Sequence, residues 1–296
     1  MTVGVLAMAY GTPRDRDDIE TYYTDIRRGR PPSPAQLADL VRRYDAIGGT
    51  FPLRAITDEQ IAVLAGALGD DFVVRLGTKH SHPTIAEGVA ELAAAGVSQV
   101  VGLVLAPHYS RFSVGDYAER AAKAGAETGL RVDTVESWHL LPAYVDFLSN
   151  AVTAALADLP AGSEVVFTAH SLPERILATG DPYADQLGET AAAVAVSAGL
   201  ATWSVGWQSA GRTPERWLGP DVLEIVRDRA SAGGAGLVVC PCGFVADHLE
   251  VAFDLDLEAA PLARVLGLPF ARTASVNADV QVMQALAGLV AAAAAR

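Results

Sequence analysis

Short apolar segments alternate with longer amphipathic segments along nearly the whole chain. The short segments are rich in β-branched residues and are bounded by glycine, proline and polar residues, which is typical of buried strands. Strands are expected at Val3–Ala9, Phe72–Leu76, Val100–Ala106, Val132–Glu136, Val165–Ala169, Thr202–Gly206 and Leu237–Cys240, with a weaker one near Arg272–Ser275. Helices are expected at Asp17–Arg28, Pro34–Ala46, Asp58–Leu68, Thr84–Ala95, Val114–Thr128, Ala143–Leu156, Ala184–Ala198, Pro220–Ala232 and Val280–Ala295. This alternation predicts an α/β fold in which helices cover both faces of parallel sheets.

The expected strands fall into two groups of four, separated by a long helical segment. The first group lies within residues 3–136 and the second within residues 165–275. A barrel and two open sheets both accommodate this pattern, and we favour two sheets because the two halves share one rhythm of strands and helices. A chain of 296 residues is long enough for two domains. We expect a first domain of residues 1–138 with a returning helix at 276–296, and a second domain of residues 139–275.

Reactive side chains directly follow several of the expected strands. Because open α/β sheets bind ligands beyond the carboxyl ends of their strands, these side chains are expected to line a cleft between the two domains. No G-x-G-x-x-G or G-x-x-x-x-G-K-[ST] motif occurs, so the usual phosphate loop of nucleotide cofactors is absent. The residues concerned are Tyr10, His80, His108, His170, Gln208, His248 and Glu250.

An acidic segment of helical pattern follows the Cys240–Gly243 turn. Glu250, Asp254 and Glu258 are spaced four residues apart, so on an α-helix each lies about 40° around from the previous one. Like charges at this spacing destabilise a helix. The row is either a solvated face of an acidic protein or a path for a divalent cation, and the spacing alone leaves both interpretations open.

Composition and charge exclude some classes of protein. The chain has 51% hydrophobic and 19% charged residues, as expected for a globular protein. Its formal net charge of −13 argues against nucleic acid as a partner, because binding a phosphate backbone needs a basic surface. No basic region precedes the first apolar run, and Val280–Ala295 is too short and too rich in alanine to span a bilayer. We therefore expect a cytoplasmic protein without a transmembrane segment.

The only cysteines, Cys240 and Cys242, stand one residue apart. Two thiols cannot supply four ligands, so an all-thiolate iron–sulfur cluster within the chain is excluded. The spacing also does not suit an ordinary structural disulfide. We expect a pair of small, half-buried thiols at a strand end in a reducing compartment.

Arginines cluster early in this acidic chain. Arg27, Arg28, Arg30, Arg42 and Arg43 lie within 17 residues. Such a group is either a solvated helix end or a site for an anionic ligand, which guanidinium groups bind through paired hydrogen bonds. The acidic background favours the anionic ligand.

Taken singly, the candidate residues also have structural explanations. His170, at the end of an expected strand, could be held by backbone hydrogen bonds. Ser171 lacks the G-x-S-x-G context of a nucleophilic serine. His80 and His82 have the spacing of two ligands on one face of a strand, although an exposed His82 before Pro83 is the simpler interpretation.

Longer blocks of sequence are far more specific than any single residue. They are LAMAYGTP at Leu6–Pro13, YYTDIRRGRPPSP at Tyr22–Pro34, YDAIGG at Tyr44–Gly49, LAPHYSRFSVGDY at Leu105–Tyr117, AHSLPERI at Ala169–Ile176, GDPYADQL at Gly180–Leu187, VGWQSAGRTPERWLGPD at Val205–Asp221 and GFVADHLEVAFDLD at Gly243–Asp256. In this order, over nearly the whole chain, they resemble the ferrochelatases. The tyrosine in AYGTP and the early arginine cluster resemble the Gram-positive branch, the coproporphyrin III ferrochelatases.

The resemblance implies two Rossmann-like domains, each with a four-stranded parallel sheet, that hold a porphyrin in the cleft between them. It implies insertion of Fe²⁺ into coproporphyrin III to form coproheme in heme biosynthesis. By position in the motifs, His170 and Glu250 are the catalytic residues and metal ligands on one side of the macrocycle, and Tyr10 approaches from the other side. Asp254 and Glu258 match an acidic row proposed to carry cations or protons. Positions expected near the propionates are Arg27, Arg28, Arg30, Arg43 and Tyr117.

The chain departs from the family pattern at one substrate-binding block. Where G-G-x-S-P is usual, it has Gly48, Gly49, Thr50, Phe51 and Pro52. One hydroxyl donor to a propionate is therefore expected to be lost, and Thr50 and Phe51 remain candidate substrate contacts. Many actinobacterial relatives carry cysteines for a [2Fe–2S] cluster, which this chain cannot bind. We expect a monomer with no permanently bound cofactor, for which Fe²⁺ and coproporphyrin III are substrates.

The residue types suit this chemistry. Metallation requires a bent ring, removal of two N–H protons and delivery of a desolvated metal. An imidazole, with a reference pKa of about 6.5, accepts a proton near neutral pH, and imidazole with carboxylate suits transient Fe²⁺ binding. Which of His170 and Glu250 is the base and which delivers the metal stays open. The alternatives are a protoporphyrin IX ferrochelatase, a related cobalt or sirohydrochlorin chelatase, and a non-catalytic tetrapyrrole or iron carrier.

Overall fold

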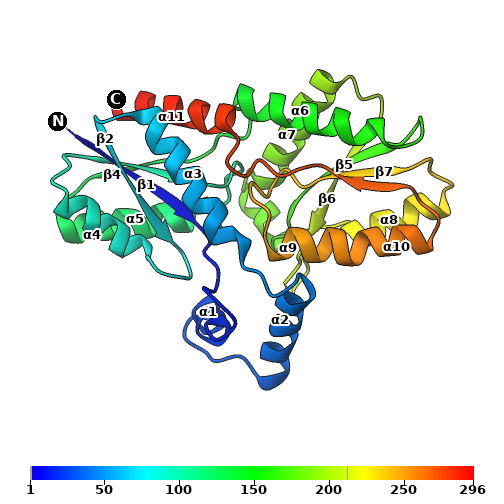
Figure 1. Cartoon of the computed structure of the whole chain (residues 1–296), viewed down its shortest axis with the longest axis horizontal. Coiled ribbons are helices and arrows are strands. Elements are labelled where there is room, and N and C mark those ends of the chain that lie inside the picture. The colour runs from blue at the N-terminus through cyan, green and yellow to red at the C-terminus, as the bar shows by residue number, and fades with distance from the viewer. Residues whose placement is uncertain (1, 212) are drawn as a thin grey trace. The chain divides into compact units, whose positions relative to one another are not determined.

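The computed structural model describes residues 2–211 and 213–296, and the chain divides into two compact units (Figure 1). Unit 1 combines the chain up to Trp138 with Asn277–Arg296, and unit 2 is His139–Val276. Each unit contains one four-stranded sheet in which all strands are parallel. The expected α/β fold with two helix-flanked parallel sheets is confirmed.

The sheet of unit 1 has the order β2-β1-β3-β4. Residues Val5 to Met8 of the central strand β1 have no exposed surface, which explains why this strand is an uninterrupted apolar run. The strands are β1 (Val3–Ala9), β2 (Phe72–Thr78), β3 (Val100–Val104) and β4 (Val132–Val135).

Helices cover both faces of the unit 1 sheet (Figure 1). Helices α4 and α5 share a buried core with β1 and β3, and α3 packs beside the C-terminal helix α11 on the opposite face. Gln60 and Gln99 fix the returning chain, since their side-chain amides donate to the carbonyls of Asn277 and Ala294, both at 2.8 Å. The helices are α1 (Ile19–Ile26), α2 (Pro34–Ala46), α3 (Pro52–Leu68), α4 (Ile85–Ala94), α5 (Val114–Thr128) and α11 (Val280–Ala294).

Unit 2 repeats the same strand order as β6-β5-β7-β8. Its strands are β5 (Glu164–His170), β6 (Trp203–Gln208), β7 (Leu237–Cys240) and β8 (Phe270–Arg272). Helices α6 (Pro142–Ala157) and α7 (Tyr183–Ala198) cover one face, and α8 (Val222–Ser231), α9 (Leu249–Val251), a π-helix η2 (Ala252–Ala259) and α10 (Ala260–Val265) cover the other. A short 3₁₀ helix η1 (Glu174–Thr179) follows β5.

Capping residues explain where three of the helices begin. Ser33 caps α2, Thr84 caps α4 and Asp221 caps α8, and each forms a reciprocal capping box with the residue three positions on. The side-chain oxygen satisfies an N–H group that has no partner inside the helix.

Three expected elements differ from the structure in type or by more than two residues at an end. Helix α3 begins at Pro52 rather than Asp58, because proline is well suited to the first helical turn. Strand β8 is Phe270–Arg272, so the expected strand near Arg272–Ser275 lay too far along the chain. The acidic segment after His248 is a π-helix over Ala252–Ala259 and not a regular α-helix. In the described part of the chain, no helix is long and apolar enough to cross a membrane.

Candidate active site

His170 is the last residue of β5, the inner strand between β6 and β7 in unit 2. Its Nδ1 lies 2.6 Å from the carbonyl oxygen of Ser171, and a carbonyl only accepts, so Nδ1 carries the proton of this hydrogen bond. In the neutral ring, the lone pair is therefore on Nε2. The Tyr183 hydroxyl donates to the His170 carbonyl at 3.0 Å and holds the backbone at this strand end.

Glu250 is brought next to that lone pair from a different element. It lies on α9, and its Oε2 is 3.8 Å from His170 Nε2 and 3.7 Å from His248 Nε2. About a third of each side chain of the His170–Glu250 pair is exposed, so the pair is open to a ligand. The two residues that the motifs single out as catalytic thus lie side by side.

The segment between β7 and α9 is docked closely on β5. Gly243 N–H donates to the Thr168 carbonyl at 2.9 Å, and a Cβ at Gly243 would lie only 2.6 Å from Ala169 Cα. The ring of Phe244 neighbours both histidines, with its centroid 6.4 Å from that of His170 and 5.3 Å from that of His248. Among the described residues, buried His248 Nδ1 has no hydrogen-bond partner.

The acidic row does not form a uniform exposed stripe. Asp254 is buried and accepts a hydrogen bond from Ser209 Oγ at 2.5 Å, whereas Glu258 is exposed. Ser209 directly follows β6. It adopts a positive φ of 56°, which is uncommon for a residue other than glycine. Within the described residues, no group of three or more His, Cys, Asp or Glu side chains is close enough to hold a metal ion. A cation path along this row stays a prediction.

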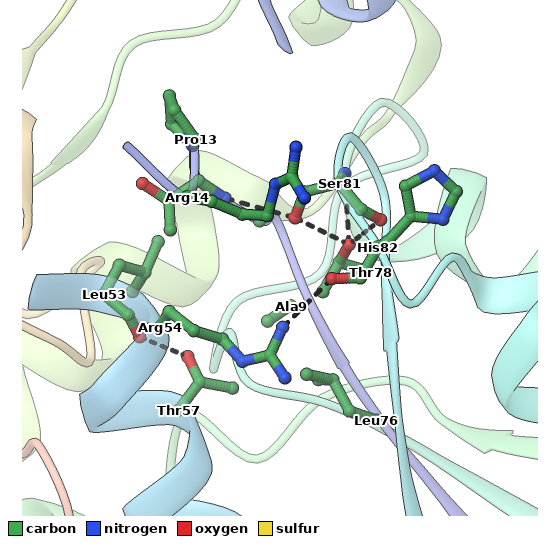
Figure 2. A pocket seen from close by; sticks show the side chains of 12 residues that line it. Ala9, Pro13, Arg14, Leu53, Arg54, Thr57, Leu76, Thr78, Ser81 and His82 are labelled. Atoms are coloured by element: carbon green, nitrogen blue, oxygen red, sulfur yellow. Dashed lines mark hydrogen bonds between the residues drawn. The ribbon is translucent and has the colours of Figure 1, made fainter. Parts of the chain in front are cut away.

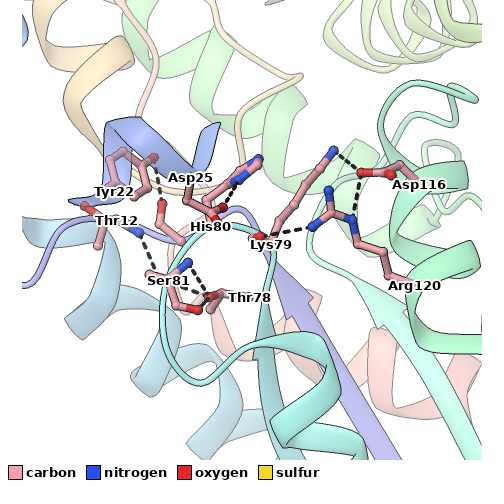
Figure 3. A network of polar contacts seen from close by, with 10 residues as sticks. Thr12, Tyr22, Asp25, Thr78, Lys79, His80, Ser81, Asp116 and Arg120 are labelled. Atoms are coloured by element: carbon pink, nitrogen blue, oxygen red, sulfur yellow. Dashed lines mark hydrogen bonds and ion pairs between the residues drawn. The ribbon is translucent and has the colours of Figure 1, made fainter. Parts of the chain in front are cut away.

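Tyr10 follows β1 in unit 1 and is well exposed, at 44% of its surface. Its ring meets that of His80 edge-on, with centroids 4.7 Å apart. The backbone N–H of His80 donates to the backbone carbonyl of Tyr10 at 3.1 Å. His80 Nδ1 pairs with Asp25 at 2.7 Å (Figure 3). Burial lowers the pKa of His80 despite this carboxylate, so the neutral ring is favoured at neutral pH.

A partly buried cation, Lys79, follows the strand next to this pair. Lys79 Nζ is 2.5 Å from Asp116, which also pairs with Arg120 Nε at 3.2 Å (Figure 3). Burial lowers the pKa of Lys79, against the opposing effect of Asp116. The same ammonium lies 5.1 Å from the ring centroid of Tyr117. Tyr117 is itself buried, which raises its pKa and keeps its hydroxyl protonated.

Four cationic side chains line an open pocket in unit 1. Asp25, Asp116 and Glu119 also reach this pocket, so part of the positive charge is already neutralised. Of the early arginines, only Arg28 lines it. The sequence analysis did not identify the other three cations as site residues. One signal was present, because Lys79 is one of only two lysines in the chain and follows an expected strand. The four cations are Arg28, Lys79, Arg111 and Arg120.

The remaining predicted propionate contacts have local partners. Arg27 and Arg30 each donate through Nε to the other's carbonyl oxygen, at 3.2 and 3.4 Å. Arg43 Nε pairs with Asp39 at 3.2 Å, one helical turn earlier. The Thr50 hydroxyl donates to the Ile47 carbonyl at 3.2 Å, and Phe51 stacks on Tyr44 with ring centroids 4.5 Å apart. Their contacts with a substrate stay predictions, as does the cleft expected between the two domains.

A second, small pocket is lined by residues on either side of Tyr10 in the sequence, Ala9 and Gly11 to Arg14, together with residues of α3 and of the segment after β2 (Figure 2). Ser81 joins the segments that follow β1 and β2, because its hydroxyl accepts from Thr12 N–H at 3.3 Å and lies 3.0 Å from Thr78 Oγ1. His82 is largely exposed and pairs with Glu87 at 2.8 Å. His80 and His82 thus have different carboxylate partners, which supports the simpler interpretation of His82.

Comparison with known proteins identifies the family. The family model described as ferrochelatase matches residues 2–294. The chain belongs to the ferrochelatase family. Proteins named coproporphyrin III ferrochelatase from Oceanobacillus iheyensis, Geobacillus sp. and Bacillus subtilis are 42%, 44% and 43% identical, and each alignment covers 97% of this chain and 96% of the relative.

Two solved structures share the fold. SirB from Bacillus subtilis with Fe³⁺ has a TM-score of 0.60 at 13% identity, and the match covers 100% of this chain and 96% of SirB. CbiX, described as the terminal enzyme of siroheme biosynthesis in denitrifying bacteria, has a TM-score of 0.56 at 17% identity over 99% of both chains. At these identities the likeness concerns the fold alone.

Proposed function

We propose that this protein inserts Fe²⁺ into coproporphyrin III and releases coproheme. Relatives that align over nearly their whole length carry this activity in their names. The structural observation that supports the chemistry most directly is the His170–Glu250 pair, in which an imidazole nitrogen lies 3.8 Å from a carboxylate oxygen at the end of a buried strand.

The reaction exchanges one Fe²⁺ for two pyrrole N–H protons, and no electrons are transferred. His170 Nε2 is assigned as the proton acceptor. The proton of the neutral ring is on Nδ1, which donates to the Ser171 carbonyl, so the lone pair is on Nε2. Glu250 stabilises the resulting imidazolium and offers oxygen to the incoming metal. His248 Nε2, 3.7 Å from the same oxygen, is the next group able to receive a proton.

Residues of unit 1 are assigned to substrate binding. Coproporphyrin III carries four propionates, and a charge-assisted hydrogen bond to each contributes about 1.5–3 kcal/mol. The exposed Tyr10 ring and the pocket that contains Arg28, Lys79 and Arg120 offer an aromatic surface and positive charge near each other. Binding energy gained at the propionates can then be used to bend the ring at the reacting nitrogens.

The decisive assay is anaerobic incubation of Fe²⁺ with coproporphyrin III, followed by loss of the free-base absorption spectrum. His170→Ala and Glu250→Ala should abolish metallation while coproporphyrin III still binds, as measured by fluorescence titration. His82→Ala is the matched control, because His82 also pairs with a glutamate but is exposed in unit 1. Metallation by both site variants at saturating substrate would contradict the assigned roles.

The choice of porphyrin is tested by comparing tetrapyrroles. Coproporphyrin III should be turned over with a higher kcat/KM than protoporphyrin IX, which has two propionates, and sirohydrochlorin with Co²⁺ should be a poor pair. Arg43→Met should weaken coproporphyrin III binding by about tenfold, the value of one charge-assisted contact. An unchanged dissociation constant would remove Arg43 from the propionate contacts.

A further inference from the structure

One guanidinium connects two carboxylates that lie on either side of Glu250. Arg272, the last residue of β8, binds Asp256 with both ends of its fork, through Nε at 2.7 Å and Nη2 at 3.0 Å. Its Nη1 donates to Asp247 Oδ1 at 3.3 Å, and the same oxygen accepts from Ser275 Oγ at 2.9 Å. Asp247 precedes α9, whereas Asp256 lies on the π-helix η2.

Buried side chains hold the second half of the segment between these carboxylates, since Val251 and Leu255 lie in the core and Asp254 accepts from Ser209. The backbone at the start of the segment is irregular. His248 is extended, with φ of −156° and ψ of −176°, and its side chain makes no capping hydrogen bond to α9. Helix α9 is only Leu249–Val251 before the hydrogen bonding changes to the π pattern, which is rare and occurs mainly as short interruptions, often at functional sites. The direction in which Glu250 projects therefore depends on the core contact of Val251 and also on what holds the two ends of this segment.

We propose that Arg272 is a positioning residue for the metallation reaction, because it joins Asp247 to Asp256 and so fixes the carboxylate of Glu250 opposite His170. This inference rests on the proposed function. Arg272 itself lies on a different strand from His170, and its side chain donates to Asp256, Asp247 and the Thr273 carbonyl.

The planar guanidinium group explains why arginine, and not lysine, suits this position. A bidentate contact with Asp256 leaves Nη1 for Asp247 and for the Thr273 carbonyl at 3.2 Å. Lysine has a single ammonium and cannot bind one carboxylate in a planar fork while reaching the second. The hydrogen bond with Asp256 also raises the pKa of Arg272, so its charge is present at every pH at which the enzyme is studied.

The test compares Arg272→Gln and Arg272→Lys with wild-type protein in the anaerobic Fe²⁺ and coproporphyrin III assay. Arg272→Gln should lower kcat by about 100-fold, since a shift of about 1 Å at a reacting group has an effect of this size. The KM for coproporphyrin III should stay within about twofold, because the residues assigned to its propionates are in unit 1. Arg272→Lys should recover only part of the lost kcat.

Arg229→Gln is the matched control. Arg229 Nε pairs with Glu164 at 3.1 Å in the same unit, so this variant also loses a partly buried ion pair, but one at the opposite end of β5 from His170. Its kcat should equal that of wild-type protein. If Arg272→Gln fails to fold, Asp247→Asn keeps the shape of the side chain, weakens the contact, and should lower kcat in the same direction by a smaller factor.

Hydrogen exchange gives a readout that needs no turnover. Backbone amides of residues 247–256 should exchange faster in Arg272→Gln than in wild-type protein or in Arg229→Gln. Faster exchange with unchanged kcat, or equal exchange in all proteins, would overturn the proposal. If wild-type protein does not metallate coproporphyrin III, the proposed function fails, and hydrogen exchange alone decides whether Arg272 holds this segment.

Discussion

Replacing Gly243 with alanine is expected to slow metallation without changing any reactive side chain. Gly243 lies between β7 and α9, and its N–H donates to the Thr168 carbonyl on β5. A Cβ built there lies 2.6 Å from Ala169 Cα and closer still to Ala169 Cβ. Carbon atoms in contact are normally about 3.5–4.0 Å apart, so either the segment or the strand must move by about 1 Å or more.

That displacement acts on the catalytic geometry, because β5 carries His170 and the segment leads to Glu250. Overpacking of this kind typically destabilises a protein by about 1–3 kcal/mol, which corresponds to a decrease in Tm of about 5 °C. A movement of about 1 Å between the two groups should lower kcat by about 100-fold. Binding of coproporphyrin III should change much less, since the residues assigned to its propionates are in unit 1.

Gly188→Ala is the control for this substitution. Gly188 lies inside α7, and a Cβ there meets no atom within 4 Å, so alanine should be tolerated and should stabilise the helix by about 0.5–1 kcal/mol. The measurements are kcat by porphyrin absorption and Tm by calorimetry. Wild-type kcat and Tm in Gly243→Ala would refute the reasoning. A lower Tm with unchanged kcat would show that the contact is tight but does not set the geometry of His170 and Glu250.

Three further outcomes are expected. Burial raises the pKa of Asp116, but the hydrogen bond and charge of Lys79 outweigh this effect and lower the pKa overall. The folded state is therefore stabilised above the unfolded pKa of about 3.9, and this stabilisation is lost as the pH falls. Asp116→Asn should therefore reduce the loss of Tm below about pH 4, and an identical acid profile would contradict this assignment. Asp221→Ala should destabilise the protein by about 1 kcal/mol in urea unfolding, because it removes the cap of α8, whereas Asp221→Asn should not. Both cysteines are buried, and burial raises the pKa of Cys242. Iodoacetamide should therefore label the thiols only after the protein is unfolded, as measured by mass spectrometry. Rapid labelling of the native protein would show that the thiols are accessible.

Strands and the position of the reactive pair could be predicted because they depend on local pattern and on neighbouring strands. Val3–Ala9 and Leu237–Cys240 have the predicted bounds, since both are buried, uninterrupted apolar runs. His170 ends β5, and Glu250 follows β7, its neighbour in the sheet. Parallel strands end at one edge of a sheet, so side chains that follow neighbouring strands are brought together.

The features that were missed depend on tertiary contacts. The acidic spacing predicted a regular helix, but the hydrogen bonding changes to the π pattern where Asp254 meets Ser209 and Asp256 meets Arg272, and neither contact can be inferred from spacing. The contact of Lys79 with Asp116 joins a strand end to a helix distant in sequence. No periodicity marks such a pair.

Both units place their candidate residues at the end of a strand or just beyond it, where the regular hydrogen bonds of the sheet stop. Unit 1 compensates by packing one post-strand segment on another: Gly11, with φ of +93°, leaves no room for a Cβ beside Ser81. Unit 2 does the same by docking the segment at Gly243 on β5. Main-chain contacts that only glycine permits therefore hold Tyr10 and Glu250 in place. In each unit, the position of the candidate residue then depends on a glycine that packs closely on a neighbouring segment as well as on the side chain itself.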